Sequence, residues 1–122
     1  MDEKEFEALM KRLGDEIRKE GGTYILNPAS VQKASEIMKR LNAIKAADTD
    51  NENEIKISMD VSEYIGHFVT IMFSCNELFF DKKDFKDIKE LFEFCDGFNI
   101  VPGQNERIIV SFSIDNYIIR LE

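Results

Sequence analysis

Two runs of alternating residues near the end of the sequence constrain its fold more than any other feature. Apolar residues occupy every second position from residue 108 to residue 114, and the alternation resumes from 117 to 121. Asp115-Asn116 stands between the runs and suits the left-handed backbone of a two-residue hairpin loop. The pattern predicts a C-terminal β-hairpin in which Ile114 faces Tyr117 and apolar pairs share one face of a sheet.

Three earlier segments also have the pattern of strands. Residues 54–61 alternate between apolar and polar side chains, which predicts a half-buried strand with one wet face. Residues 64–75 are largely apolar on both faces, which favours a central strand. Residues 98–101 predict a short strand, and residues 102–105 predict a turn before the hairpin.

Three further segments have the spacing of amphipathic helices. Residues 2–20 predict the first of them. Asn27-Pro28 suits the start of the second, because asparagine is a good N-cap and proline fits the first helical position. The apolar stripe of this helix continues to about residue 47. Asp81 suits the start of the third helix.

The order of these segments predicts an α+β fold. Two N-terminal helices precede a mainly antiparallel sheet of about five strands, with a third helix inserted and a hairpin at the C-terminus. The length of 122 residues suits a single domain spanning residues 1–122. With 43% hydrophobic residues the chain can fill a core, and its ten phenylalanines make Phe the main filler.

Several features indicate a cytoplasmic protein. The longest apolar run, residues 68–73, is far shorter than the roughly 20 residues of a membrane helix. The acidic start of the chain lacks the pattern of a secretory signal. Cys75 and Cys95 lack zinc-site spacing, and we expect buried free thiols, with a disulfide as the alternative.

The net charge of −8 is unevenly distributed. Residues 48–63 carry six carboxylates against one lysine. An acidic chain is a poor direct binder of nucleic acid, but it suits a basic partner. We therefore expect Asp48, Asp50, Glu52 and Glu54 to form a docking surface for a basic or nucleic-acid-binding protein.

The same acidic segment has part of the spacing of a calcium-binding EF-hand loop. Asp48, Asp50 and Glu52 could supply ligands, but Asn53 replaces the turn glycine and Met59 replaces the closing glutamate. We expect a solvated loop, with no metal and no other cofactor.

The sequence has few residues that suggest a catalytic site. His67 is the only histidine, and no nucleophile stands at a matching spacing. We therefore expect a small acidic intracellular binding protein of the adaptor or inhibitor type, rather than an enzyme. The alternative is a homo-oligomeric domain that binds a small ligand in a Phe-rich pocket, with His67 or Tyr64 as polar handle.

Two isoleucines fall on the predicted outer face of the C-terminal hairpin. Ile109 points away from Ile108 and Val110, and Ile118 points away from Tyr117. Two apolar side chains on an outer face suggest cover, either by a helix of the same chain or by a second subunit. A homo-oligomer with an interface at Ile109 and Ile118 is therefore a second hypothesis.

Overall fold

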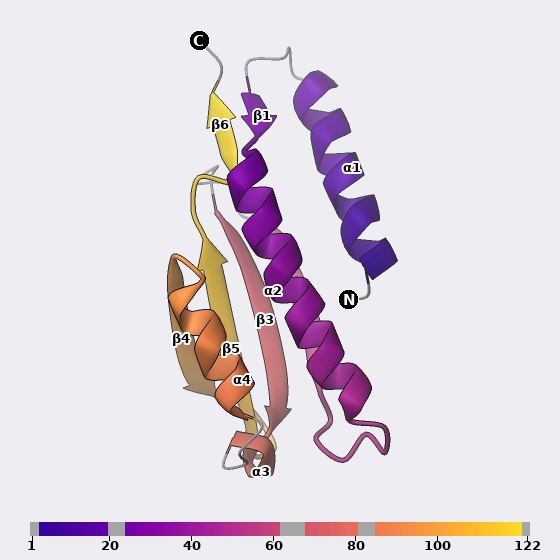
Figure 1. Cartoon of the computed structure of the whole chain (residues 1–122), viewed down its shortest axis with the longest axis vertical. Coiled ribbons are helices and arrows are strands. Elements are labelled where there is room, and N and C mark those ends of the chain that lie inside the picture. The colour runs from indigo at the N-terminus through magenta and orange to yellow at the C-terminus, as the bar shows by residue number, and fades with distance from the viewer. Residues whose placement is uncertain (1–2, 20–23, 62–67, 81–84, 121–122) are drawn as a thin grey trace.

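A four-stranded antiparallel sheet forms the centre of the protein. The computed structural model describes residues 3–19, 24–61, 68–80 and 85–120. The strands lie in the order β2 (Lys56–Val61), β3 (Val69–Asn76), β5 (Arg107–Ile114) and β4 (Gly97–Pro102). Each strand runs antiparallel to its neighbour, so β2 and β4 are the two edges (Figure 1).

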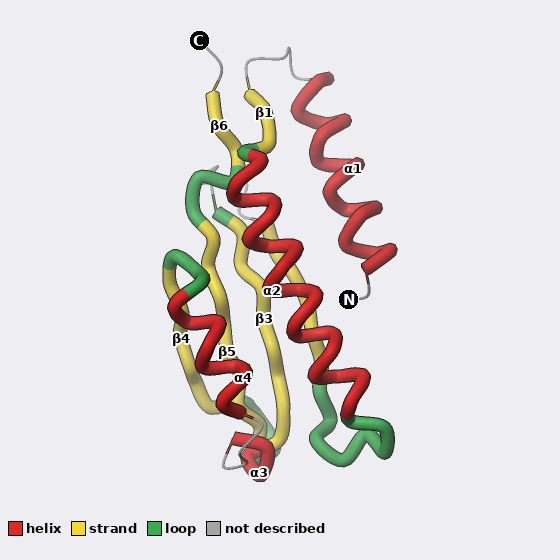
Figure 2. Tube along the Cα trace, in the orientation of Figure 1, coloured by secondary structure: helices red, strands yellow, loops and turns green. Residues whose placement is uncertain are grey.

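The helices lie on one side of this sheet (Figure 2). The long helix α2 (Pro28–Ala47) crosses β2, β3 and β5, and α1 (Glu3–Lys19) lies alongside α2. The short helix α4 (Phe85–Glu90) continues into a 3₁₀ turn, Leu91–Glu93, and α3 (Glu77–Phe80) follows the end of β3. Within the described ranges, no helix combines the length and apolar character needed to cross a bilayer.

Helix α2 begins as its sequence predicts. The Asn27 side chain accepts a hydrogen bond from Ala29 N at 3.2 Å, and Pro28 occupies the first turn. Its buried stripe follows the spacing of one helix face and consists of Ser30, Ala34, Ile37, Met38 and Leu41.

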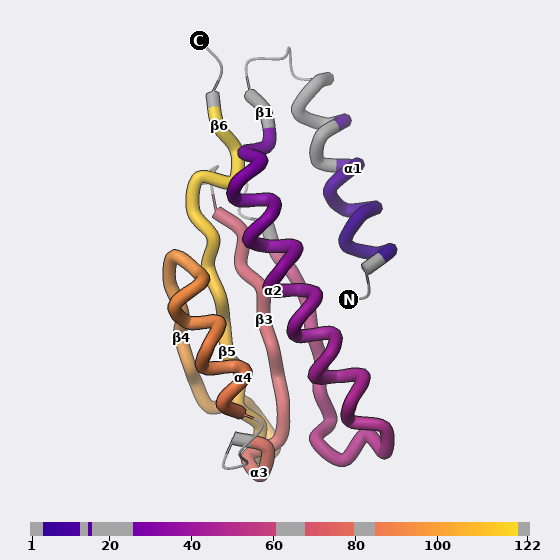
Figure 3. The backbone as a smooth tube through the Cα atoms, in the orientation of Figure 1, coloured from indigo at the N-terminus to yellow at the C-terminus, as the bar shows by residue number. Residues whose placement is uncertain are grey.

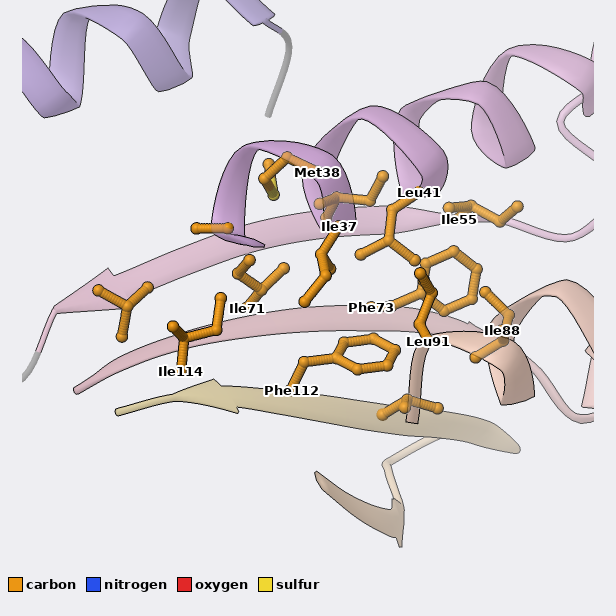
Figure 4. Packing of buried hydrophobic residues seen from close by; sticks show 14 of the residues in the cluster. Ile37, Met38, Leu41, Ile55, Ile71, Phe73, Ile88, Leu91, Phe112 and Ile114 are labelled. Carbon is orange, nitrogen blue, oxygen red and sulfur yellow. The ribbon is translucent and has the colours of Figure 1, made fainter. Parts of the chain in front are cut away.

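The hydrophobic core fills the space between this stripe and the sheet (Figure 4). Ile37 and Leu41 of α2 point toward Ile71 and Phe73 of β3. Side chains from β5 and from the α4 segment close the core on the other side, and each is fully buried: Phe112, Ile114, Ile88 and Leu91. The strands and helices are therefore held together mainly through one layer of apolar contacts.

The sheet is buried on one face and open on the other. Along β3 every second side chain, from Val69 to Cys75, is fully buried under the helices. The intervening side chains are partly exposed, and no described helix lies over them (Figure 2). We call this second side the open face; it consists of Ser58, Thr70, Met72, Ser74, Asn99, Val101, Arg107, Ile109, Ser111 and Ser113 with their neighbours.

A separate two-stranded ribbon joins the two ends of the chain. Strand β1 (Tyr24–Leu26) pairs antiparallel with β6 (Ile118–Arg120), and Ile25 lies opposite Ile119. Figure 3 shows this pairing of an early segment with the last described one. The predicted C-terminal hairpin is therefore wrong, because β5 pairs with β3 and β4 and not with β6.

The start of α2 explains why the chain leaves the sheet after β5. The Ser30 hydroxyl donates to the Asp115 carbonyl at 2.9 Å, and Asn27 N donates to the Tyr117 carbonyl at 2.8 Å. Asn116 adopts φ 53°, as expected for a turn asparagine. The Tyr117 side chain is fully buried, and its hydroxyl donates to the Met10 sulfur. These contacts replace the cross-strand pairs that the alternation predicts.

The predicted class of fold is confirmed. The protein has the expected α+β architecture, with a mainly antiparallel sheet and a helix inserted between strands. The strand predicted at 54–61 is β2, and the turn predicted at 102–105 joins β4 to β5. The strand predicted at 64–75 begins in the described residues only at Val69, and Asp81 lies outside them.

Candidate functional site

A pocket of about 640 Å³ opens where α2 ends, between residues 48–53 and α4. We call it the acidic groove. Its described lining residues come from the end of α2, the loop that follows it, α3 and α4, and they are Arg40, Ala43, Ile44, Ala47, Asp48, Thr49, Asp50, Glu52, Asn53, Phe79, Asp87 and Glu90.

The lining combines negative charge with an apolar floor. Among the described lining residues, five carboxylates and one guanidinium give a net charge of −4. Phe79 is buried and Ile44 is half-buried, whereas Asp50 and Glu90 are exposed. Carboxylates beside an apolar surface attract a cation more strongly than the same groups fully surrounded by water.

Asp48 holds the acidic loop in shape. Its carboxylate accepts hydrogen bonds from Glu52 N at 3.1 Å, from Asn53 N at 3.0 Å and from Asn53 Nδ2 at 3.1 Å. Asn51 takes a left-handed backbone with φ 53°, which asparagine tolerates well. Asp48 lines the groove, but three hydrogen bonds to its own loop make its first role structural.

The sheet anchors the same loop from the other side. Asn76, at the end of β3, donates its backbone N–H to the Asn53 carbonyl at 3.1 Å. Its side-chain amide donates to the Glu52 carbonyl at 2.8 Å. The groove carboxylates of Asp50 and Glu52 are therefore carried on an ordered loop, which lowers the entropy cost of binding.

Glu54 belongs to a different contact. Its carboxylate lies 3.2 Å from Arg107 Nη1, and its carbonyl accepts from Arg107 Nη2 at 2.6 Å. The Arg107 side chain is only 16% exposed and also donates to the Ser74 hydroxyl. The four predicted docking residues thus divide: Asp48, Asp50 and Glu52 line the groove, and Glu54 is not part of its lining.

Sequence reasoning missed the opposite wall of the groove. Asp87 and Glu90 on α4 line it, and neither was among the predicted docking residues. Their spacing of three places both carboxylates on the same side of a helix. That spacing was available as a signal, but nothing in the sequence indicates that this side faces the acidic loop.

Arg40 is the one cation among the lining residues that the structure describes, and it makes two contacts at the rim of the groove. Its Nε lies 3.1 Å from Glu36 Oε1, one helical turn earlier. Its guanidinium carbon lies 5.8 Å from the centre of the Phe94 ring. Both contacts of this side chain are therefore with residues outside the groove lining.

The remaining predicted site residues lie elsewhere. His67 and Tyr64 are outside the described residues. Ile109 lies half-buried on the open face, as its alternation predicts, whereas Ile118 lies in the ribbon and packs against the core. The structure does not bring these two isoleucines together on one hairpin face.

Among the described residues, no group of three His, Cys, Asp or Glu side chains is arranged to hold a metal ion. Cys75 and Cys95 are free, the first fully buried and the second half-buried. Burial raises the pKa of the Cys75 thiol to about 11 and also raises the pKa of Cys95.

Comparison of the chain with protein-family models, curated proteins and solved structures finds no match.

Proposed function

We propose that this protein is a small acidic binding protein of the adaptor or inhibitor type that docks a basic segment of a protein partner in the acidic groove. The observation that carries the proposal is a groove whose described lining residues have a net charge of −4 over an apolar floor. The loop that forms one wall is held by Asp48 and Asn76, so the site exists before the partner arrives.

The negative charge and the apolar floor of the groove suit a lysine or arginine side chain. The aliphatic stem of such a side chain gains by lying on Ala43, Ile44 and Ala47, while its cationic head stays near carboxylates. Walls formed by Asp50 and Glu52 on one side and by Asp87 and Glu90 on the other could contact the head from two directions. Arginine fits this arrangement better than lysine, because its planar guanidinium can engage two carboxylates.

The class of partner follows from the charge of the whole chain. A net charge of −8 repels nucleic acid and speeds encounter with a basic protein, including one that binds nucleic acid itself. The proposal is one of binding without catalysis or cofactor. A cytoplasmic setting agrees with two cysteines that are free thiols.

The test uses a short peptide with two arginines between neutral residues and a matched peptide with citrulline in their place. Citrulline keeps the length of the arginine stem but has no charge. We expect calorimetry to detect binding of the arginine peptide alone. Replacing Asp87 with Asn together with Glu90→Gln should weaken that binding at least about tenfold, or about 1.4 kcal/mol. Affinity should also fall as salt rises.

The matched control removes the same amount of charge far from the groove. Glu7 on α1 and Asp60 on β2 are both exposed, and neither lines the groove. The variant with Glu7→Gln and Asp60→Asn should bind the arginine peptide nearly as well as the unmodified protein. If both double variants lost the same affinity for the arginine peptide, binding would depend only on the net charge of the protein. That result would contradict a binding role for the groove.

A further inference from the structure

The two edge strands of the sheet differ in the side chains that they expose to solvent. Strand β2 carries exposed charges at Lys56 and Asp60, as is usual for an edge that must avoid pairing. Strand β4 has no charged residue between Gly97 and Pro102. Its apolar side chains are exposed: Phe98 by 53%, Ile100 by 37% and Val101 by 37%. An uncharged apolar edge is a template for another strand.

The hydrogen-bond pattern shows which backbone groups of β4 face outward. Gly103 N donates to the Arg107 carbonyl at 2.7 Å, and this pair continues the register in which Val101 lies opposite Ile109. Because bonding alternates along an antiparallel pair, the odd-numbered residues of β4 bond to β5. Phe98 and Ile100 therefore present their N–H and C=O groups at the free edge, and Pro102 presents only a carbonyl.

From this pattern we infer that β4 pairs with β4 of a second copy of the chain, antiparallel, across a two-fold axis at Asn99. In this register Phe98 lies opposite Ile100 of the second copy, and Ile100 lies opposite its Phe98. Both residues then exchange their N–H and C=O groups, so every outward group of Phe98 and Ile100 is paired. The outward hydrogen-bonding groups of β4 therefore match those of a second β4 related by the two-fold axis.

The neighbouring register fits less well. An axis at Ile100 would place Phe98 opposite Pro102 of the second copy. Proline has no N–H, so the Phe98 carbonyl would lose its donor. The proline thus favours the axis at Asn99 over the axis at Ile100.

Side chains on the helix side of the sheet support the same arrangement. The Phe98 ring stacks on Phe92 with a centroid distance of 4.1 Å and an angle of 8°. Pairing would place Ile100 of the second copy beside the exposed part of this ring. Phe98 and Ile100 would then be covered in each copy, which removes apolar surface from water.

The edge itself favours a second copy over an unrelated strand. The outward N–H and C=O groups of Phe98 and Ile100 match one another across the two-fold axis. The same axis brings together the exposed apolar side chains of these two residues in both copies.

Solution mass tests the dimer. Light scattering coupled to gel filtration should give twice the 14.2 kDa of one chain at micromolar concentrations. Asn99→Lys should reduce the mass to that of one chain, because the axis would place two lysines directly opposite each other. The matched control is Ser58→Lys, which adds the same exposed charge to the open face at the other edge and should leave the dimer intact. Unchanged circular dichroism should show that both variants fold.

Cross-linking tests the register. With Cys95 replaced by Ser, Asn99→Cys should give a disulfide-linked dimer on mild oxidation, because non-bonded opposed residues lie about 4.5 Å apart. Val101→Cys lies on the same face, but its two copies would stand roughly 13 Å apart along the strands and should not link. A mass of one chain throughout, a dimer that survives Asn99→Lys, or equal linking of both cysteine variants would each overturn the inference.

Discussion

The two faces of the sheet are built from the same strands, and they differ in every physical respect. On the helix side, the side chains of Phe73 and Phe112 are fully buried in close contact with helices. On the open face, their neighbours in sequence, Met72 and Ser111, lie opposite each other and keep contact with solvent. The contrast indicates that side chains on the helix side supply most of the free energy of unfolding. Substitutions on the open face should therefore change that free energy little.

A truncation in the buried layer should have the largest effect. Phe112→Ala removes a fully buried ring from the middle of β5, and we expect a loss of about 3–5 kcal/mol in the free energy of unfolding. Denaturant unfolding measures the loss. The control, Ser111→Ala, changes the adjacent residue on the open face and should shift stability by less than about 0.5 kcal/mol. Similar losses in both variants would abolish the contrast between the faces.

The buried layer should also respond to high pH. Burial raises the pKa of Cys75 to about 11, above its ordinary value near 9. The unfolded chain therefore loses this proton first, so stability should hold below pH 9 and fall as pH rises toward 11. The loss assigned to Cys75 is on the order of 2 kcal/mol, since each tenfold difference in proton affinity corresponds to about 1.4 kcal/mol. Urea unfolding as a function of pH measures it.

The Cys75→Ala variant separates this thiol from other groups. Burial also raises the pKa of Tyr117, so part of the decline above pH 10 should persist in the variant. The remaining slope between pH 9 and 10 should be shallower than in the unmodified protein. Alkylation of Cys75 in the folded protein should be slow at neutral pH, because the reactive thiolate is scarce and enclosed. Rapid labelling of Cys75 would contradict its burial.

The acidic loop also combines an inward side chain that stabilises the structure with an exposed one that does not. Asp48 turns its carboxylate into the loop, whereas Asp50 is exposed. Asp48→Ala should cost about 1–2 kcal/mol through lost hydrogen bonds, and Asp50→Ala should cost nearly nothing. Thermal unfolding compares the two. Equal melting temperatures would mean that Asp48 does not hold the loop.

The smallest effect should come from a change confined to the open face. Thr70 and Ser113 lie opposite each other there, on β3 and β5. Replacing Thr70 with Val keeps the shape and the strand preference, so stability should stay within about 0.5 kcal/mol. A large loss measured by denaturant unfolding would indicate that the open face is covered in solution.

The sequence correctly predicted those elements whose pattern depends only on residues close together in the chain. The alternation of residues 54–61 predicted β2, and Asn27-Pro28 predicted the start of α2, because each pattern depends only on neighbouring residues. The C-terminal hairpin failed for the opposite reason. The alternation after residue 116 is real, but the carbonyls around it bind Ser30 and Asn27, and no local pattern contains that information.

The candidate site was predicted only in part for a similar reason. Composition alone identified the acidic loop as a candidate, and three of its four residues line the groove. Nothing in the sequence distinguishes the inward Asp48 from the outward Asp50. The second wall comes from Asp87 and Glu90, and only the folding of α4 beside the loop makes it part of the same site.

The pairing of β1 with β6 also determines when this protein can finish folding as it leaves the ribosome. Ser30 reaches Asp115 across 85 residues of chain, and Met10 reaches Tyr117 across 107. A nascent chain that ends at β5 contains the whole four-stranded sheet, yet β1 has no partner and the Met10 side of α1 lacks its tyrosine. Contacts of such long separation form slowly. The first helix should therefore remain accessible to chaperones and proteases until the last strand emerges.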